Sequence, residues 1–206
     1  MGLGVNLGIN ALAGSATSFA NDYSVGFDGS DDYAQGTGAF TSFNGQAAAS
    51  INFWFKRDDV TTTQYIMTQY ESGSNNYYAY AIGADRIDLY LNGSVRVRMQ
   101  SLGMANNTWY NFGFTFDGSL SNYSKGKGYW NGTPTGTSFN TTFTSIGSFT
   151  SPFKFSGRWN ASNGNNDLEY AGNIDEVSIW QSALSEANHT AIYNSGTPLD
   201  ISTLGI

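Results

Sequence analysis

Apolar and polar residues alternate in short runs along most of this chain. The clearest run covers residues 49–56, where Ala49, Ile51, Phe53 and Phe55 fall on one face and mainly polar side chains fall on the other. Because successive side chains of a β-strand point to opposite faces, this pattern predicts a strand with one buried face. Similar runs predict further strands at residues 23–27, 65–69, 77–82, 86–91, 94–99, 109–116, 127–130, 153–155 and 170–180.

Residues 86–99 carry the strongest local signal, two alternating runs joined by Asn92 and Gly93. An Asn-Gly pair suits a type I′ turn, which needs positive φ at both central positions, so these residues are predicted to form a β-hairpin. We expect Arg96 and Arg98 to lie on a solvated sheet face. The predicted inward residues are Ile87, Leu89, Leu91, Val95, Val97 and Met99.

A helical rhythm of 3.6 residues is missing before Ser185, so a helix is expected only near the C-terminus. Ser185 is predicted to be the N-cap, Glu186 complements the positive end of the helix dipole, and Gly196 is expected to stop the helix. His189 lies within this helix, where a solvated side chain is the expected state.

Six segments occur in an order that is similar to laminin G-like jelly rolls of the concanavalin A-like lectin type. They are residues 23–33, 51–56, 109–112, 129–132, 172–177 and 183–185. The resemblance covers roughly residues 22–200 and implies an all-β, two-sheet antiparallel jelly-roll sandwich with one short C-terminal helix and an N-terminal arm. Such domains are also found in virion surface proteins of bacterial viruses. The same sandwich hosts lectins, adhesion modules, glycanases and scaffold proteins, so the resemblance predicts the fold rather than the function.

The chain is predicted to divide into an N-terminal arm at residues 1–21, a laminin G-like domain at residues 22–200 and a C-terminal tail at residues 201–206. Residues 2–13 are mildly apolar, but Gly and Asn interrupt them and the stretch has no Lys or Arg, so we interpret them as an uncleaved arm rather than a signal peptide. An arm with so little charge and bulk is expected to dock on a neighbour.

Composition narrows the function classes. Sixteen Asp and Glu against nine Lys and Arg give a net charge of −7, which argues against a nucleic-acid partner because phosphate binding needs clustered cations. The chain has no cysteine, so it has neither disulfides nor thiolate chemistry. No apolar run approaches the roughly 20 residues of a membrane span.

The chain is predicted not to be an enzyme. Sandwich glycanases of the resembled superfamily place carboxylates at alternating positions of one strand, whereas simple alternation puts Asp175 and Glu176 on opposite faces. We therefore interpret Asp175 as a structural residue that accepts backbone N–H bonds near a turn. No Gly-x-Ser-x-Gly motif accompanies His189, so a nucleophilic triad has no support either.

Two acidic loops are candidate metal sites. Related sandwiches bind Ca²⁺ through loop oxygens, which makes Ca²⁺ an open alternative here. Asp and Asn are also the residues that ordinary turns prefer, and this turn interpretation is favoured. The candidate metal ligands are Asp28, Asp31, Asp32, Asn165 and Asp167.

Aromatic residues next to turns are candidate sugar contacts, because the C–H faces of sugar rings suit a π surface. The alternative, favoured for any single residue, is that they pack across strands or in the core. The candidate ligand-binding residues are Tyr77, Tyr78, Trp130 and Trp159.

These observations together predict a non-catalytic, surface-displayed jelly-roll module. We interpret it as a virion structural protein, a capsid decoration or tail-associated protein that joins capsid or tail proteins through the arm, is oligomeric or lattice-associated, and adheres to glycans. The expected location is the virion surface or the extracellular space. The alternative is a secreted carbohydrate-binding, lectin-like module that depends on Ca²⁺.

Overall fold

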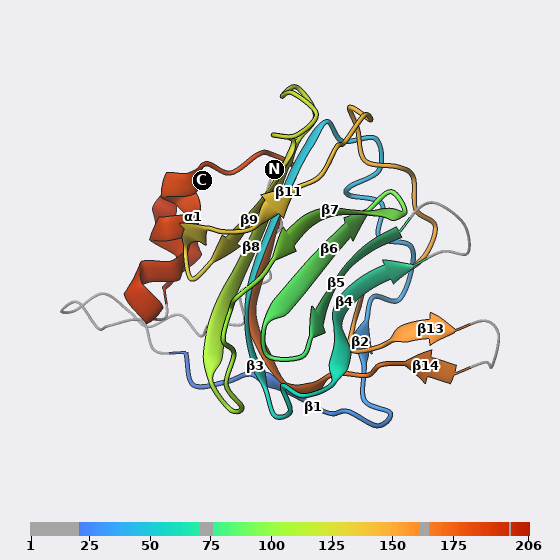
Figure 1. Cartoon of the computed structure of the whole chain (residues 1–206), viewed down its shortest axis with the longest axis vertical. Coiled ribbons are helices and arrows are strands. Elements are labelled where there is room, and N and C mark those ends of the chain that lie inside the picture. The colour runs from blue at the N-terminus through green and yellow to red at the C-terminus, as the bar shows by residue number, and fades with distance from the viewer. Residues whose placement is uncertain (1–20, 71–75, 161–164, 198) are drawn as a thin grey trace.

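The computed structural model of the 206-residue chain describes residues 21–70, 76–160, 165–197 and 199–206. Within these residues, two antiparallel β-sheets pack face to face, and a single α-helix near the C-terminus lies beside them (Figure 1). The all-β, two-sheet sandwich with one short C-terminal α-helix is therefore confirmed. Residues 1–20, which make up nearly all of the predicted arm, lie outside the described residues.

The two sheets are built from strands far apart in the sequence. The six-stranded sheet has the order β1 (Val25–Asp28), β15 (Ala171–Trp180), β3 (Ala48–Arg57), β8 (Trp109–Asp117), β9 (Gly126–Trp130) and β10 (Thr133–Pro134). The seven-stranded sheet has the order β11 (Thr137–Ser138), β7 (Ser94–Met99), β6 (Arg86–Leu91), β5 (Asn76–Ile82), β4 (Thr63–Tyr70), β12 (Lys154–Phe155) and β2 (Ala34–Gln35). A separate small hairpin pairs β13 (Arg158–Asn160) with β14 (Asn165–Asp167).

The core lies between the two sheets, where their alternating apolar positions meet. The predicted inward residues of β3 are all buried, and the apolar face of β8 pairs with them in register. The Phe53 and Phe112 rings, which are cross-strand partners, lie 5.0 Å apart between centroids. Each fully buried side chain of this size contributes about 1.5–3 kcal/mol, so the β3–β8 pair is a main source of stability.

The hairpin of β6 and β7 forms as predicted, with positive φ at Asn92 (49°) and Gly93 (76°). A β-bulge adds one residue to β7 between the cross-strand pairs Leu89–Val97 and Tyr90–Val95. Leu89 and Val97 are both buried. Val95, which was predicted to face inward, instead pairs with Tyr90 and is only half-buried. The prediction for Val95 was therefore wrong, because a bulge changes the face of every residue on one side of it.

Helix α1 (Glu186–Tyr193) covers part of the outer face of the six-stranded sheet. Ser185 is the N-cap as predicted, and its side chain accepts a hydrogen bond from the Asn188 backbone N–H. The helix ends at Asn194 in the left-handed conformation, not at Gly196, which closes the following short 3₁₀ helix η1 (Asn194–Gly196). Asn tolerates that conformation through its short polar side chain.

His189 was expected to be solvated, but its side chain is fully buried between α1 and the sheet. Its ring stacks on Tyr129, with centroids 3.8 Å apart, and its Nε2 lies 2.9 Å from the Thr115 Oγ1. The helix approaches this closely because Gly113 has no side chain; a Cβ there would lie 2.5 Å from the His189 Nδ1. The prediction failed because the buried side of a short helix depends on strands distant in sequence.

The predicted C-terminal tail, residues 201–206, contains the 3₁₀ helix η2 (Ile201–Leu204). Ile201 and Leu204 pack against the small apolar cluster of Trp180, Leu184 and Ile192 beside α1. Among the residues that the structure describes, no helix is long and apolar enough to cross a membrane.

Candidate functional site

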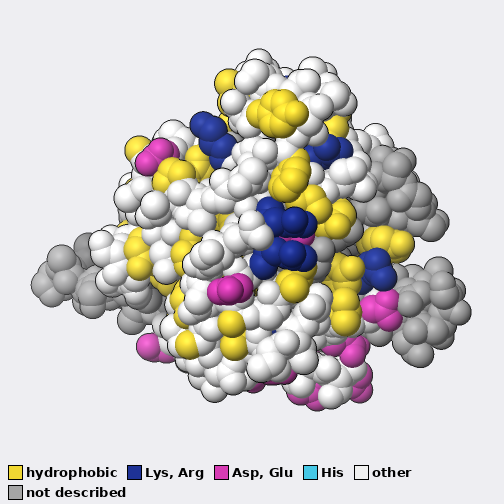
Figure 2. All heavy atoms as spheres, viewed as in Figure 1, with side chains coloured by type: hydrophobic (Ala, Val, Ile, Leu, Met, Phe, Trp, Pro, Cys, Tyr) yellow, Lys and Arg dark blue, Asp and Glu magenta, His cyan; other side chains and the backbone are white. Residues whose placement is uncertain are grey.

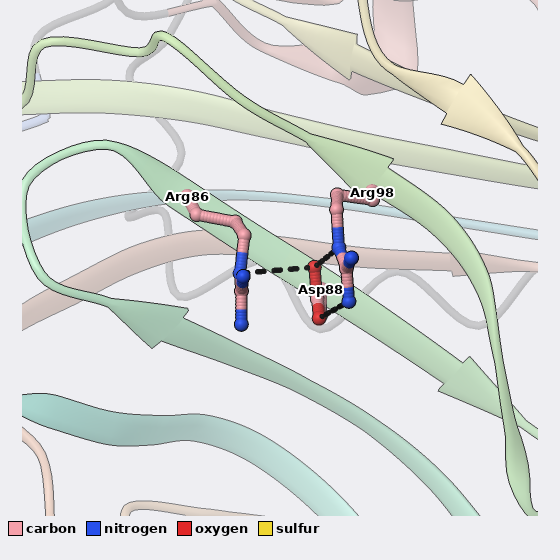
Figure 3. Close-up of polar contacts among 3 residues, drawn as sticks. All are labelled: Arg86, Asp88 and Arg98. Atoms are coloured by element: carbon pink, nitrogen blue, oxygen red, sulfur yellow. Dashed lines mark hydrogen bonds and ion pairs between the residues drawn. The ribbon is translucent and has the colours of Figure 1, made fainter.

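The outer face of the seven-stranded sheet carries an unusual gathering of positive charge for an acidic chain. Figure 2 shows Lys and Arg side chains clustered near the middle of this face, with hydrophobic side chains around them. The cluster lies over β6 and β7, whose alternate residues face away from the core. We call the group formed by Arg86, Asp88 and Arg98 the arginine site (Figure 3).

Asp88 is the centre of the arginine site and is fully buried. Arg98 donates two hydrogen bonds to it, from Nε to Oδ1 and from Nη2 to Oδ2, each 2.7 Å long. Arg86 approaches from the other side, with its Nε 3.5 Å from the Asp88 Oδ1 (Figure 3). The carboxylate therefore fixes the guanidinium of Arg98 by two hydrogen bonds, and it attracts the guanidinium of Arg86 by charge alone. The trio keeps a net charge of +1.

Both arginine side chains remain about one third exposed, 32% for Arg86 and 30% for Arg98. In the described part of the chain, nothing accepts a hydrogen bond from the two Nη atoms of Arg86. The guanidinium of Arg98 also lies over the Phe139 ring, 5.6 Å from its centroid. Arg86 thus presents an oriented pair of donors, a geometry that matches a carboxylate or phosphate.

The arginine site does not follow from simple alternation in the sequence, because the bulge of β7 creates it. With a two-residue turn and simple pairing, Asp88 would oppose Val97. The bulge shifts the register by one, and Asp88 opposes Arg98. Arg98 was expected to be a solvated surface residue, but it is bound to a buried carboxylate.

The predicted aromatic contacts do not assemble into one surface. Trp130 packs against the core, with its ring 4.8 Å from Tyr110 and 5.8 Å from Phe55. The backbone of β5 pairs Tyr77 with Leu91 and Tyr78 with Tyr90, and that of β13 pairs Trp159 with Asn166. The side chains of Tyr77, Tyr78 and Trp159 lie outside the described residues.

Of the predicted metal ligands, the structure brings together Asp28, Asp31 and Asp32, whose carboxylates lie within 4.8 Å of one another and are exposed. Asp32 accepts a hydrogen bond from the Asp28 backbone N–H, and Asp28 accepts one from Ser30, as in ordinary turns. Their oxygen donors suit Ca²⁺, and they also serve the turn. The other predicted loop lies apart from this group: Asp167 forms an ion pair with Arg158 at 3.1 Å, and the side chain of Asn165 lies outside the described residues.

The expected separation of Asp175 and Glu176 on opposite faces of their strand was wrong. A second bulge lies between Asp175 and Ser178, and Glu176 adopts a left-handed φ of 48°. Both carboxylates therefore reach the same side of the sheet, where the Asn21 Nδ2 donates to Asp175 at 2.8 Å and to Glu176 at 3.2 Å. Asp175 also accepts the Glu176 backbone N–H at 2.8 Å, in keeping with its predicted structural role.

This two-sheet sandwich with a helix on one outer face defines a protein of the lectin-like β-sandwich class. The chain belongs to the concanavalin A-like lectin/glucanases superfamily, whose laminin G-type family model matches residues 28–188. Comparison with curated protein sequences finds no match.

Solved structures with the same fold include the native heptameric SAP-like pentraxin from Limulus polyphemus, with 14% identity, a TM-score of 0.64 and coverage of 82% of this chain and 80% of that one. Another is Ruminococcus gnavus IT-sialidase CBM40 bound to α2,3-sialyllactose, with 11% identity, a TM-score of 0.61 and coverage of 82% and 96%. Domains LG4-5 of the mouse laminin α1 chain match at 12% identity and a TM-score of 0.57, over 80% of this chain and 42% of that one. At these identities the likeness concerns the fold alone.

Proposed function

We propose that this protein is a non-catalytic, lectin-like module that binds acidic glycans through the arginine site. The observation that carries the proposal is the buried Asp88, which pairs with Arg86 and Arg98 on the outer sheet face and leaves the three residues with one positive charge in excess. A sugar carboxylate would accept hydrogen bonds from the Nη atoms of Arg86, which no described residue uses. Charge-assisted bonds of this kind contribute about 1.5–3 kcal/mol each.

A solved structure of the same fold supports an acidic glycan as the ligand. Members of the same fold include R. gnavus IT-sialidase CBM40, solved with sialyllactose, a glycan that carries a carboxylate. The net charge of −7 would repel acidic glycans from most of the surface, so binding requires a local positive site such as this one.

A catalytic role for Asp175 and Glu176 has little support. Retaining glycosidases hold two carboxyl groups about 5–5.5 Å apart, flanking the scissile bond. Here the Asn21 amide lies between the two carboxylates and donates to both, in the place where a scissile bond would have to lie. Both acids are therefore held by the same amide group on one side of the sheet.

Display on a virion surface, with residues 1–21 as the anchor to capsid or tail proteins, stays a prediction from the sequence. One contact is in keeping with it: Asn21, the last residue of the predicted arm, is bound to the sandwich through Asp175 and Glu176. This proposal concerns where the module is displayed, and it is independent of the ligand at the arginine site.

Calorimetric titration with matched glycans tests the ligand. We expect 3′-sialyllactose to bind at least about tenfold more tightly than lactose, because only the former carries a carboxylate. Arg86→Gln should weaken sialyllactose binding about 10- to 100-fold, the loss of one charge-assisted contact. Lys127→Gln, which removes an exposed cation on β9 of the other sheet, is the matched control and should change nothing.

Sialyl- and glucuronosyl-oligosaccharides should be compared with their neutral parents in the same way. If carboxylated and neutral glycans bind equally, the acidic specificity is wrong. If no glycan binds, the lectin-like function is wrong. If Arg86→Gln and Lys127→Gln weaken sialyllactose binding equally, the effect is one of non-specific charge, and the glycan does not bind at the arginine site.

A further inference from the structure

A second hollow lies on the opposite side of the sandwich, on the outer face of the six-stranded sheet next to α1. It has a volume of about 320 Å³, close to the lower end of the range for small-molecule sites. We call it the β15 pocket; its lining consists of residues 21–24, Trp54, Lys56, Trp109, Asp175, Glu176 and Gly196. The cross-strand pairs Asp175–Trp54 and Lys56–Trp109 form its floor.

Negative charge is in excess in the β15 pocket. Asp22, Asp175 and Glu176 face a single cation, Lys56. Within the described residues, no Lys, Arg or His forms an ion pair with Asp175 or Glu176. Burial raises the pKa of both carboxyl groups, because desolvation outweighs the hydrogen bonds that they accept.

Aromatic rings border these carboxylates. Trp54 stacks on Tyr193 with centroids 5.5 Å apart, and Trp109 and Tyr23 are 37% and 84% exposed. The Lys56 Nζ lies 5.4 Å from the Trp109 ring centroid, so one ammonium group of the protein already rests on a tryptophan here. Rings beside unneutralised carboxylates are the combination that recognises organic cations.

We propose that the β15 pocket binds an organic ammonium group carried by a molecule of about monosaccharide size. A single nitrogen, the Asn21 Nδ2, already donates to both Asp175 and Glu176, so the two acids are placed to share one nitrogen donor. An ammonium group that replaced the Asn21 amide would place N–H donors at the same position and add the positive charge that the amide lacks. Trp109 and Tyr23 would contact the body of the ligand.

A neutral sugar fits the charges less well, since hydroxyl groups would leave two half-buried carboxylates uncompensated. The site is also distinct from the arginine site, because it lies on the other sheet and has the opposite charge. The two inferences can therefore fail separately.

The experiment compares glucosamine with glucose, which differ by an ammonium in place of a hydroxyl group. Binding to the full chain is followed by NMR shifts of the Trp54 and Trp109 indole N–H groups at a pH where the amine is protonated. We expect glucosamine to shift both signals and glucose to leave them unchanged at the same concentration. Ethanolamine, an unrelated primary amine that is also protonated, should compete with glucosamine.

The double variant Asp175→Asn/Glu176→Gln removes the charges and keeps acceptors for Asn21 and for the Glu176 backbone N–H. It should weaken glucosamine binding at least about tenfold, whereas Asp58→Asn, a loss of one exposed charge outside the pocket, should have no effect. A far-UV circular dichroism spectrum and a cooperative thermal melting curve like those of the wild type would show that the double variant is folded. Equal binding of glucose and glucosamine, an unchanged affinity in the double variant, or no shift with either amine would each overturn the proposal.

Discussion

The burial of His189 makes the stability of this protein depend on pH in a calculable way. The imidazole is fully buried against Tyr129 and Thr115, and desolvation lowers its pKa from an ordinary 6.5 to about 4. In the unfolded chain the same group takes up a proton near pH 6.5. Acidification through this window therefore favours the unfolded state, because that state binds the proton first.

The sign and the size of this pH effect follow from the linkage between proton binding and folding. The contribution of His189 is present in full above about pH 6.5 and is lost as the pH falls towards 4. A difference of about 2.5 pKa units, at 1.36 kcal/mol per unit, corresponds to about 3 kcal/mol. This free energy is a large fraction of the stability of a typical domain.

The assay is urea unfolding of the wild type and of His189→Gln at intervals between pH 4 and 7. Asp175 and Glu176 have raised pKa values, so their contribution runs in the opposite direction, but it is common to both proteins and cancels in the difference. The gap between the two curves should shrink by about 3 kcal/mol on going from pH 7 to pH 4. Parallel curves, or imidazole NMR signals that titrate near pH 6.5 in the folded protein, would refute the reasoning.

Two further substitutions test the packing around these sites. Asp88→Asn should destabilise the fold by about 2–3 kcal/mol and should weaken sialyllactose binding. The loss of stability is smaller than for a fully buried ion pair, because Arg86 and Arg98 are partly exposed. Thermal melting and calorimetric titration measure the two effects, and an unchanged melting temperature would contradict the role of Asp88. Gly113→Ala should lower the free energy of unfolding by about 1–3 kcal/mol, because the new methyl group would meet the His189 Nδ1 at 2.5 Å. Amide hydrogen exchange in α1 should become faster, and unaltered protection of α1 would argue against the close approach.

Features that depend on local pattern could be predicted from the sequence. The alternation in residues 49–56 gave the buried face of β3, and Asn92 with Gly93 gave the turn between β6 and β7. Ser185 also capped α1 as expected. In each case the decisive residues are neighbours in the chain, and the order of such segments was enough to identify the fold.

Both candidate sites depend on bulges, which alternation does not reveal. The bulge after Leu89 brings Asp88 opposite Arg98, and the one after Asp175 brings Glu176 to the same face through a left-handed backbone that is rare for Glu. The bulge in β7 could have been predicted by writing out the cross-strand pairs of the hairpin. A two-residue turn without a bulge would have put Arg98 opposite Ile87, which was predicted to face inward. No comparable signal marks the second.

Binding of an acidic glycan at the arginine site is tested most directly by an NMR titration that observes the side-chain Nε–H signals of Arg86 and Arg98. Addition of 3′-sialyllactose should shift both signals in a saturable manner, because the sugar carboxylate changes the charge beside each guanidinium, while lactose at equal concentration should leave them in place. If sialyllactose binds with these signals unmoved, or if lactose moves them equally, the arginine site is not where this protein recognises an acidic glycan.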